Sequence, residues 1–168
     1  MAELTTSDRL QPSLLDRLTD DHPHMTQESR ERRVMSMRQL RQAVLRDLAW
    51  LLNAPANPRG DEIYQFPLVA RSVVNYGVPD LTGLTTSGIS ITKLEQMVYD
   101  AITHFEPRIL HAGLTVRAVA STRDGGETDH KFEFEITGDL CPLPMPEAMY
   151  VRTEVDLETG RYEVRDKV

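Results

Sequence analysis

Hydrophobic residues recur every three or four positions in two stretches of the chain, the spacing of a helix with one apolar face. In the first stretch, residues 30–53, they are Met37, Leu40, Val44, Leu48 and Leu51. In the second, residues 92–105, they are Leu94, Met97, Val98, Ala101, Ile102 and Phe105. The pattern predicts two amphipathic helices, the first ended by Pro55 and Pro58 and the second begun by a Thr92–Glu95 capping box.

After Arg108 the period changes from about 3.6 residues to 2, which is the period of a half-buried strand. The alternating stretches are residues 114–120, 131–137, 149–157 and 161–165. Helices followed by consecutive strands predict an α+β fold, with N-terminal helices packed on a C-terminal antiparallel meander of three to four strands. The last strand is predicted to lie at an edge of this sheet.

After a polar loop at residues 54–62, residues 64–76 show a weaker pattern, which predicts a turn and a short helix over residues 69–75. Gly77 follows Asn75 and Tyr76, an order that suits a helix end with a glycine in a left-handed cap.

The N-terminal region, residues 1–27, is polar and turn-prone apart from Leu10, Leu14, Leu15 and Leu18. We expect a flexible segment with a short docking helix at about residues 10–18. Whether this helix docks on another protein or on its own domain stays open. The length of the chain, 168 residues, suits one further domain over residues 28–168.

The sequence Phe105-Glu106-Pro107-Arg108 places two opposite charges around a proline where the second helix must stop. Pro107 lacks an N–H group and disfavours the helical conformation at Glu106, so this corner is held in place. On an extended segment the two charges would lie too far apart to pair well, and we expect each to bind elsewhere. Those partners could be internal or belong to another protein.

Composition narrows the functional classes. The formal net charge of −7 argues against nucleic-acid binding. Cys141 is the single cysteine and cannot form an internal disulfide, which suits a reducing compartment. The sequence shows neither a membrane span of ~20 apolar residues nor a signal peptide, so we expect a cytoplasmic protein without direct membrane insertion.

No spacing of acids, histidines or glycines points to catalysis. Glu95, Asp100, Glu106 and Asp80 are acids among many, and none forms a pair that the spacing singles out for glycoside hydrolysis. The five histidines lack the companions of a metal site. We therefore expect no catalytic residue, no metal and no cofactor, and interpret the chain as a binding protein.

Four stretches carry a family resemblance: residues 12–18, 46–53, 72–81 with Gly83, and 105–108. In this order and spacing, over about residues 12–165, the chain resembles the TssE family. These are small baseplate subunits of bacterial type VI secretion systems, similar to the small wedge protein of contractile phage tails in the lysozyme-like baseplate family.

The resemblance implies a structural baseplate component that joins the wedge proteins TssF and TssG to the TssB–TssC sheath and templates sheath polymerisation. It would act in the cytoplasm, at a baseplate docked on the inner membrane and in contact with other baseplate proteins. The resemblance places Glu106, Pro107 and Arg108 at the sheath junction, and the predicted edge strand adds Arg161, Tyr162, Glu163 and Val164 as the acceptor of a sheath segment. Those expected to dock on the wedge are Leu14, Leu15 and Leu18. Two alternatives stay open: a residual peptidoglycan-cleaving lysozyme-like enzyme, and the wedge protein of a prophage or contractile injection particle.

Overall fold

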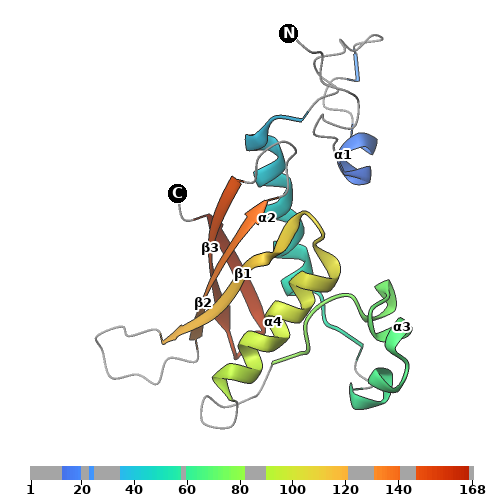
Figure 1. The fold of residues 1–168 in the computed structure, drawn as a ribbon, viewed down its shortest axis with the longest axis vertical. Coiled ribbons are helices and arrows are strands. Elements are labelled where there is room, and N and C mark those ends of the chain that lie inside the picture. Colours follow the sequence, from blue (N-terminus) through green and yellow to red (C-terminus); the bar gives the residue numbers. More distant parts are fainter. Residues whose placement is uncertain are drawn as a thin grey trace.

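The helices come first along the chain and the strands last, as predicted (Figure 1). The computed structural model describes residues 13–19, 23–24, 35–57, 60–81, 90–120, 131–140 and 147–166. Its helical elements are α1 (Leu14–Leu18), α2 (Met37–Asn53), the 3₁₀ turn η3 (Gly60–Gln65), α3 (Pro67–Ala70), the 3₁₀ turn η4 (Val73–Asn75) and α4 (Ile91–Phe105). The strands are β1 (Ile109–Ala120), β2 (Lys131–Leu140), β3 (Glu147–Asp156) and β4 (Arg161–Asp166). The α+β class is confirmed.

The strands form one antiparallel meander in the order β1-β2-β3-β4. The pairing of β2 with β3 is regular, whereas the register of β1 against β2 shifts between Leu110 and Thr115. β1 and β4 form the two edges, which confirms the edge position predicted for the last strand. β1 begins at Ile109 rather than at residue 114, directly after the charged corner.

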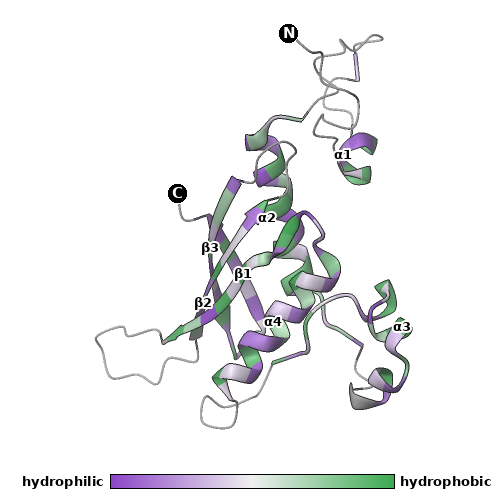
Figure 2. Ribbon diagram, viewed as in Figure 1, coloured by the Kyte–Doolittle hydropathy of each residue, from purple (hydrophilic) through white to green (hydrophobic). Residues whose placement is uncertain are grey.

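Two helices cover one face of the sheet: α4 packs on β1, and α2 packs on β4 and beside α4. The strands and α4 each carry both hydrophobic and hydrophilic residues (Figure 2), because each has one face toward the core. The inward side chains of β2, including Phe134 and Ile136, meet the stripes of α2 and α4 in one buried cluster. Burial of each such side chain stabilises the fold by about 1.5–3 kcal/mol.

Helix α2 ends at Asn53, ahead of Pro55 as predicted, but begins later than residue 30. Residues 30–34 lie outside the described residues, and residues 35 and 36 are not helical. Ser36 is the N-cap, because its hydroxyl accepts the Gln39 N–H at 3.3 Å while the Gln39 side chain accepts the Ser36 N–H at 2.8 Å. This reciprocal capping box determines where the helix starts.

The capping box predicted for α4 is wrong. Helix α4 begins at Ile91 with Ser90 as its N-cap, and no side chain caps it. The Glu95 carboxylate accepts instead the main-chain N–H of Ala118 in β1, at 2.7 Å. A tertiary hydrogen bond has replaced the local one.

Residues 60–75 form three short helical turns, η3, α3 and η4, where the sequence predicted a turn and one helix. Pro67 is the first residue of α3, the position that tolerates a missing N–H. In Figure 1 this segment lies on the far side of α4 from the sheet. Among the described helices, none is both long and apolar enough to cross a bilayer.

Gly77 has a positive φ of 122°, so the predicted need for glycine is confirmed, but its cause is a close tertiary approach. A Cβ atom at this position would lie 2.1 Å from the carbonyl oxygen of Ala54. The closeness allows Val78 N–H to donate to Ala54 O at 3.0 Å and Ala56 N–H to donate to Val78 O at 2.9 Å. These two bonds join the end of α2 to the loop before α4.

We predict that Gly77→Ala lowers the free energy of unfolding by about 2–4 kcal/mol, since the methyl group must displace the Ala54 carbonyl and the backbone is strained. Urea denaturation measures this loss. Gly160→Ala is the matched control: its φ of 66° lies in the left-handed region at a cost of roughly 1 kcal/mol. Equal losses in the two variants would contradict the explanation.

Candidate assembly site

The corner between α4 and β1 is built by local hydrogen bonds. Glu106 is the C-cap of α4, with φ −122° and ψ 78°, and its N–H donates to the carbonyl of Ile102 at 2.9 Å. The Ile109 N–H then donates to the Glu106 carbonyl at 3.2 Å, so β1 starts immediately. The chain leaves the helix at Glu106, as Pro107 predicted.

Glu106 and Arg108 pair with each other, so the prediction that they would be too far apart is wrong. Arg108 Nε donates to Glu106 Oε1 at 2.6 Å, Nη2 contacts Oε2, and the Arg108 N–H adds a bond to Oε1 at 3.2 Å. The reason is that Pro107 and Arg108 form a turn rather than an extended segment. In this turn the side chains of residues 106 and 108 come close enough to form hydrogen bonds with each other.

The pair is extended by residues of α2 and α1. Arg108 Nη2 also donates to Asp47 Oδ2 at 2.6 Å, and Arg46 Nε donates to Asp47 Oδ1 at 2.9 Å. Arg46 Nη1 in turn donates to Asp16 Oδ1 at 2.6 Å. We call this alternating series of Asp16, Arg46, Asp47, Arg108 and Glu106 the charge chain. It connects α1, α2 and the corner.

Burial makes the charge chain energetically important at its inner end. Glu106 is only 4% exposed, whereas the Arg108 side chain keeps 24% of its exposure. Burial by itself lowers the pKa of the Arg108 guanidinium, but the hydrogen bonds and charge of Glu106, then of Asp47, outweigh it and hold that pKa above its ordinary value. Arg108 is therefore a permanent cation beside a buried carboxylate.

At the outer end, the hydrogen bond from Arg46 lowers the pKa of the Asp16 carboxyl and outweighs the opposing effect of burial. The same bond raises the pKa of Arg46. A lowered carboxyl pKa stabilises the folded state above the ordinary value of 3.8, and this contribution disappears as the pH falls through the folded value. The link from α1 to α2 is thus fully charged at neutral pH.

Three aromatic residues, Tyr76, Phe105 and Trp50, lie beside the charge chain. The Tyr76 ring meets the Phe105 ring edge to face, with centroids 5.3 Å apart. Burial raises the pKa of Tyr76, and the charges of Asp47 and Glu106 add to the rise. The Arg46 guanidinium lies over the Trp50 ring, 5.0 Å from its centroid, in a cation–π contact.

The charge chain and its aromatic neighbours therefore bring together four separate parts of the sequence. Residues 12–18 contribute Asp16, residues 46–53 contribute Arg46, Asp47 and Trp50, residues 72–81 contribute Tyr76, and residues 105–108 contribute the corner. These are the four stretches on which the family resemblance was based.

The three leucines expected to dock on a partner lie in α1 and face outward. Leu14 is 71% exposed, Leu15 43% and Leu18 75%. Asp16, on the same helix, is bonded both to Ser13 and to Arg46. The Asp16–Arg46 ion pair thus holds α1 against α2, while the three leucines of α1 stay exposed at the surface.

The junction residues expected in β4 are divided between its two faces. Tyr162 is buried and Val164 half-buried on the core side, whereas Arg161 and Glu163 are exposed. Within the described residues no hydrogen bond or ion pair joins β4 to the corner. The strand and the corner each contact α2 instead. Arg41 of α2 forms a two-bond ion pair with Asp166 of β4, with both distances 2.7 Å, and Asp47 of α2 accepts a bond from Arg108 of the corner.

Asn53, the last residue of α2, contacts Tyr162 of β4, and the sequence did not predict this contact. Its Oδ1 accepts the main-chain N–H of Tyr162 at 3.0 Å, and its Nδ2 donates to the Tyr162 carbonyl at 2.9 Å. The only signal in the sequence was a polar amide at the end of an apolar stripe. That signal does not identify a partner in the last strand.

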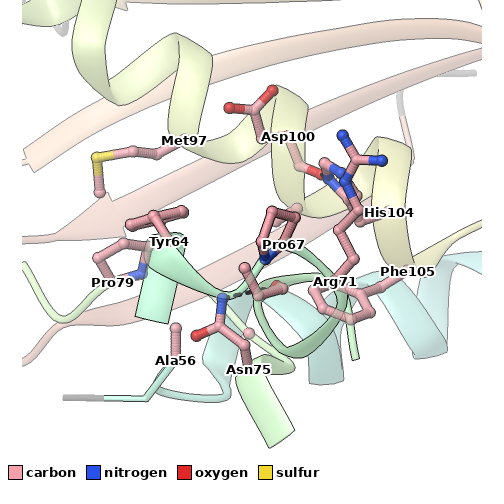
Figure 3. Close-up of a pocket in the computed structure, with 13 residues that line it drawn as sticks. Ala56, Tyr64, Pro67, Arg71, Asn75, Pro79, Met97, Asp100, His104 and Phe105 are labelled. Atoms are coloured by element: carbon pink, nitrogen blue, oxygen red, sulfur yellow. Dashed lines mark hydrogen bonds between the residues drawn. The ribbon is translucent and has the colours of Figure 1, made fainter. Parts of the chain in front are cut away.

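A pocket of about 270 Å³ lies between the 60–79 segment and α4 (Figure 3). Tyr64, Pro67 and Arg71 line one side, with Asp100 and His104 opposite them. The Asp100 carboxylate accepts a bond from Gln96 at 2.8 Å, and His104 Nδ1 lies 2.6 Å from the Asp100 carbonyl oxygen. Both groups are engaged by their own helix, and neither belongs to the charge chain.

Comparison with known protein families gives a match. Residues 38–141 match the family described as baseplate wedge protein gp25. The chain belongs to the baseplate wedge gp25 family. Membership of the wedge family gives it a structural role in a phage-like baseplate, in contact with other baseplate proteins. The matched range contains Arg46, Asp47 and the corner, whereas α1 and β4 lie outside it. No curated protein and no solved structure matches the chain.

We predict that Arg108→Met lowers the free energy of unfolding by roughly 2–4 kcal/mol, because it leaves the buried Glu106 carboxylate without its cation. The lower end of this range reflects the exposure that Arg108 retains. Urea denaturation at pH 7 measures the change. Arg165→Met is the matched control, since Arg165 and its partner Glu163 are both well exposed and such pairs contribute little. An Arg108→Met variant as stable as this control would refute the structural importance of the charge chain.

Proposed function

We propose that this wedge protein is the TssE-type subunit of a type VI secretion system. It is a non-enzymatic cytoplasmic protein that joins TssF and TssG to the TssB–TssC sheath, at a baseplate docked on the inner membrane. One observation carries the proposal: the four stretches of the TssE-like pattern, distant in sequence, meet in the charge chain and its aromatic neighbours.

The wedge side of the proposed junction is α1. Its leucines form a small apolar surface of the kind that docks in a groove of another protein. The Asp16–Arg46 ion pair holds that surface beside α2. Docking on TssF and TssG therefore requires little ordering of α1, which favours affinity.

The sheath side is the free edge of β4. Main-chain groups of a strand point alternately to its two sides, and Tyr162 bonds outward to Asn53. By alternation Val164 and Asp166 also face outward, whereas residues 161, 163 and 165 bond to β3. A segment of a sheath subunit can add to this edge as a further strand.

The opposite edge is less suited to receive a strand. On β1 the Glu95 carboxylate lies against the outward N–H of Ala118. A charge at an edge strand is a common protection against pairing with another chain. The β4 edge also receives a helix side chain, Asn53 at Tyr162, but that amide is neutral and binds only one end of the strand. This favours β4 as the acceptor, and a preformed acceptor would template the first sheath ring.

In this proposal Glu106, Pro107 and Arg108 support the junction from within. Glu106 is buried and bonded to Arg108, so its charge holds the corner rather than a partner. The same bonding speaks against a role as a general acid in peptidoglycan cleavage, as does the bond from Glu95 to the β1 main chain. In this proposal the carboxylates of Glu106 and Glu95 have structural roles, as hydrogen-bond acceptors within the fold.

To test the wedge side, Leu14, Leu15 and Leu18 would be changed together to serine. Because all three lie at the surface, we expect an unchanged melting temperature and loss of co-purification with a TssF–TssG complex. Leu68→Ser is the control, since Leu68 is exposed on α3, a different element. Wild-type protein that fails to bind TssF–TssG would overturn the assignment to a secretion system.

To test the sheath side, Val164→Pro removes one outward N–H while leaving the bonds of residues 163 and 165 to β3. We expect a folded protein that no longer supports TssB–TssC sheath assembly, scored by fluorescence microscopy of labelled sheaths in cells. Glu163→Pro removes an N–H that bonds to β3 and serves as the control for loss of folding. Normal sheaths with Val164→Pro would count against strand addition at β4.

A further inference from the structure

The free edge of β4 is closed at one end by a side chain. The Asn53 amide bonds to both the N–H and the carbonyl of Tyr162, at 3.0 and 2.9 Å. A carboxamide presents a donor and an acceptor side by side, just as the main chain of a neighbouring strand does. Asn53 thus takes the place that one residue of a fifth strand would occupy.

This closure is firmly held. The Asn53 Nδ2 group donates a second bond to the Ala49 carbonyl at 2.7 Å, so the amide is held to its own helix as well. At the other end of β4, Arg41 binds Asp166. Arg41 and Asn53 are twelve residues apart on α2, about 18 Å along the helix axis. Helix α2 therefore spans β4 and holds the amide in position.

The remainder of the edge is open. The outward main-chain groups of Val164 meet no hydrogen-bonding partner in the part of the chain that the structure describes. The main-chain groups of Asp166, two residues further along the strand, point to the same side. An added strand has these positions available and meets the Asn53 amide at Tyr162.

We propose that Asn53 is a register stop for the strand that β4 accepts. The incoming segment pairs with Val164 and Asp166 and ends at the Asn53 amide. Without the stop, a strand could slip by two residues and still present the same faces, because side chains alternate with a period of two. A slip toward Tyr162 would have to break both amide bonds. The inference rests on the proposed function, since it assumes that β4 accepts a strand.

The same geometry describes the segment that fits. Val164 is half-buried on the core side of β4, so the segment needs an apolar side chain on that side. On the solvent side, Glu163 and Arg165 pair at 2.7 Å, and opposite charges across strands are favourable. We expect an extended sheath segment with apolar residues on one face and mixed charges on the other.

The test uses amide hydrogen exchange, followed by NMR on the full chain, with synthetic peptides spanning the terminal segments of TssB and TssC. In the free protein we expect the Tyr162 amide to exchange slowly and the Val164 amide quickly. In Asn53→Ala the Tyr162 amide should also become fast. Gln42→Ala removes an exposed amide of the same helix and should leave both rates unchanged.

Upon binding, a matching peptide should protect Val164 in the wild-type protein without altering Tyr162 or the side-chain NH₂ signals of Asn53. With Asn53→Ala it should also protect Tyr162 and bind about tenfold more tightly, the effect of one or two further hydrogen bonds. Displacement of the Asn53 amide by the peptide in the wild type would overturn the proposal. So would equal Tyr162 exchange in free wild type and Asn53→Ala.

The outcomes separate the two proposals. If a peptide protects Val164 but Asn53→Ala changes neither the paired residues nor the affinity, the register stop fails while strand addition stands. If no peptide protects Val164 and Val164→Pro still assembles sheaths, strand addition at β4 fails and the stop fails with it.

Discussion

The structure depends on the buried carboxylate of Glu106. A carboxylate removed from water costs several kcal/mol unless cations and hydrogen-bond donors surround it. Here the Arg108 side chain and main-chain N–H supply them, and Arg108 is in turn bonded to Asp47 of α2. The requirement to neutralise one inner charge thereby determines how the α4–β1 corner sits against α2. Each further member of the charge chain carries the opposite charge to the one before it, and the series ends at Asp16 in α1.

Helix α2 is the element that relates the other parts to one another. Its first half binds the end of β4 through Arg41, its middle binds the corner and α1 through Arg46 and Asp47, and its last residue binds the start of β4. In the proposed function, a protein that connects two partners must keep its two attachment surfaces, α1 and the edge of β4, at a fixed distance. One rigid helix bonded to both surfaces meets that requirement without a large interface between them. The two sheet edges also receive side chains from helices: Glu95 at β1 and Asn53 at β4.

Periodicity predicted the α+β class, the two long helices and the four strands, because burial of one face is a property of each segment by itself. Helix starts were predicted less well. Thr92 and Glu95 have the spacing of a capping box, yet Glu95 bonds to β1 instead. At Ser36 the box is real, although the apolar pattern did not show that the helix begins there. A short polar side chain has several possible main-chain partners, and packing decides among them.

The sequence by itself determined the two long helices and the strands, the end of α2 and the place of the corner, since Pro107 removes an N–H wherever the rest of the chain lies. Only the tertiary structure decided which groups pair. Arg108 meets Asp47 across 61 residues, and Asn53 meets Tyr162 across 109. Such contacts arise because α2 packs along β4 and beside α4. The pattern of residues along the chain does not show which distant elements pack together. The corner was visible in the sequence, but its internal pairing and the closed end of the β4 edge were not.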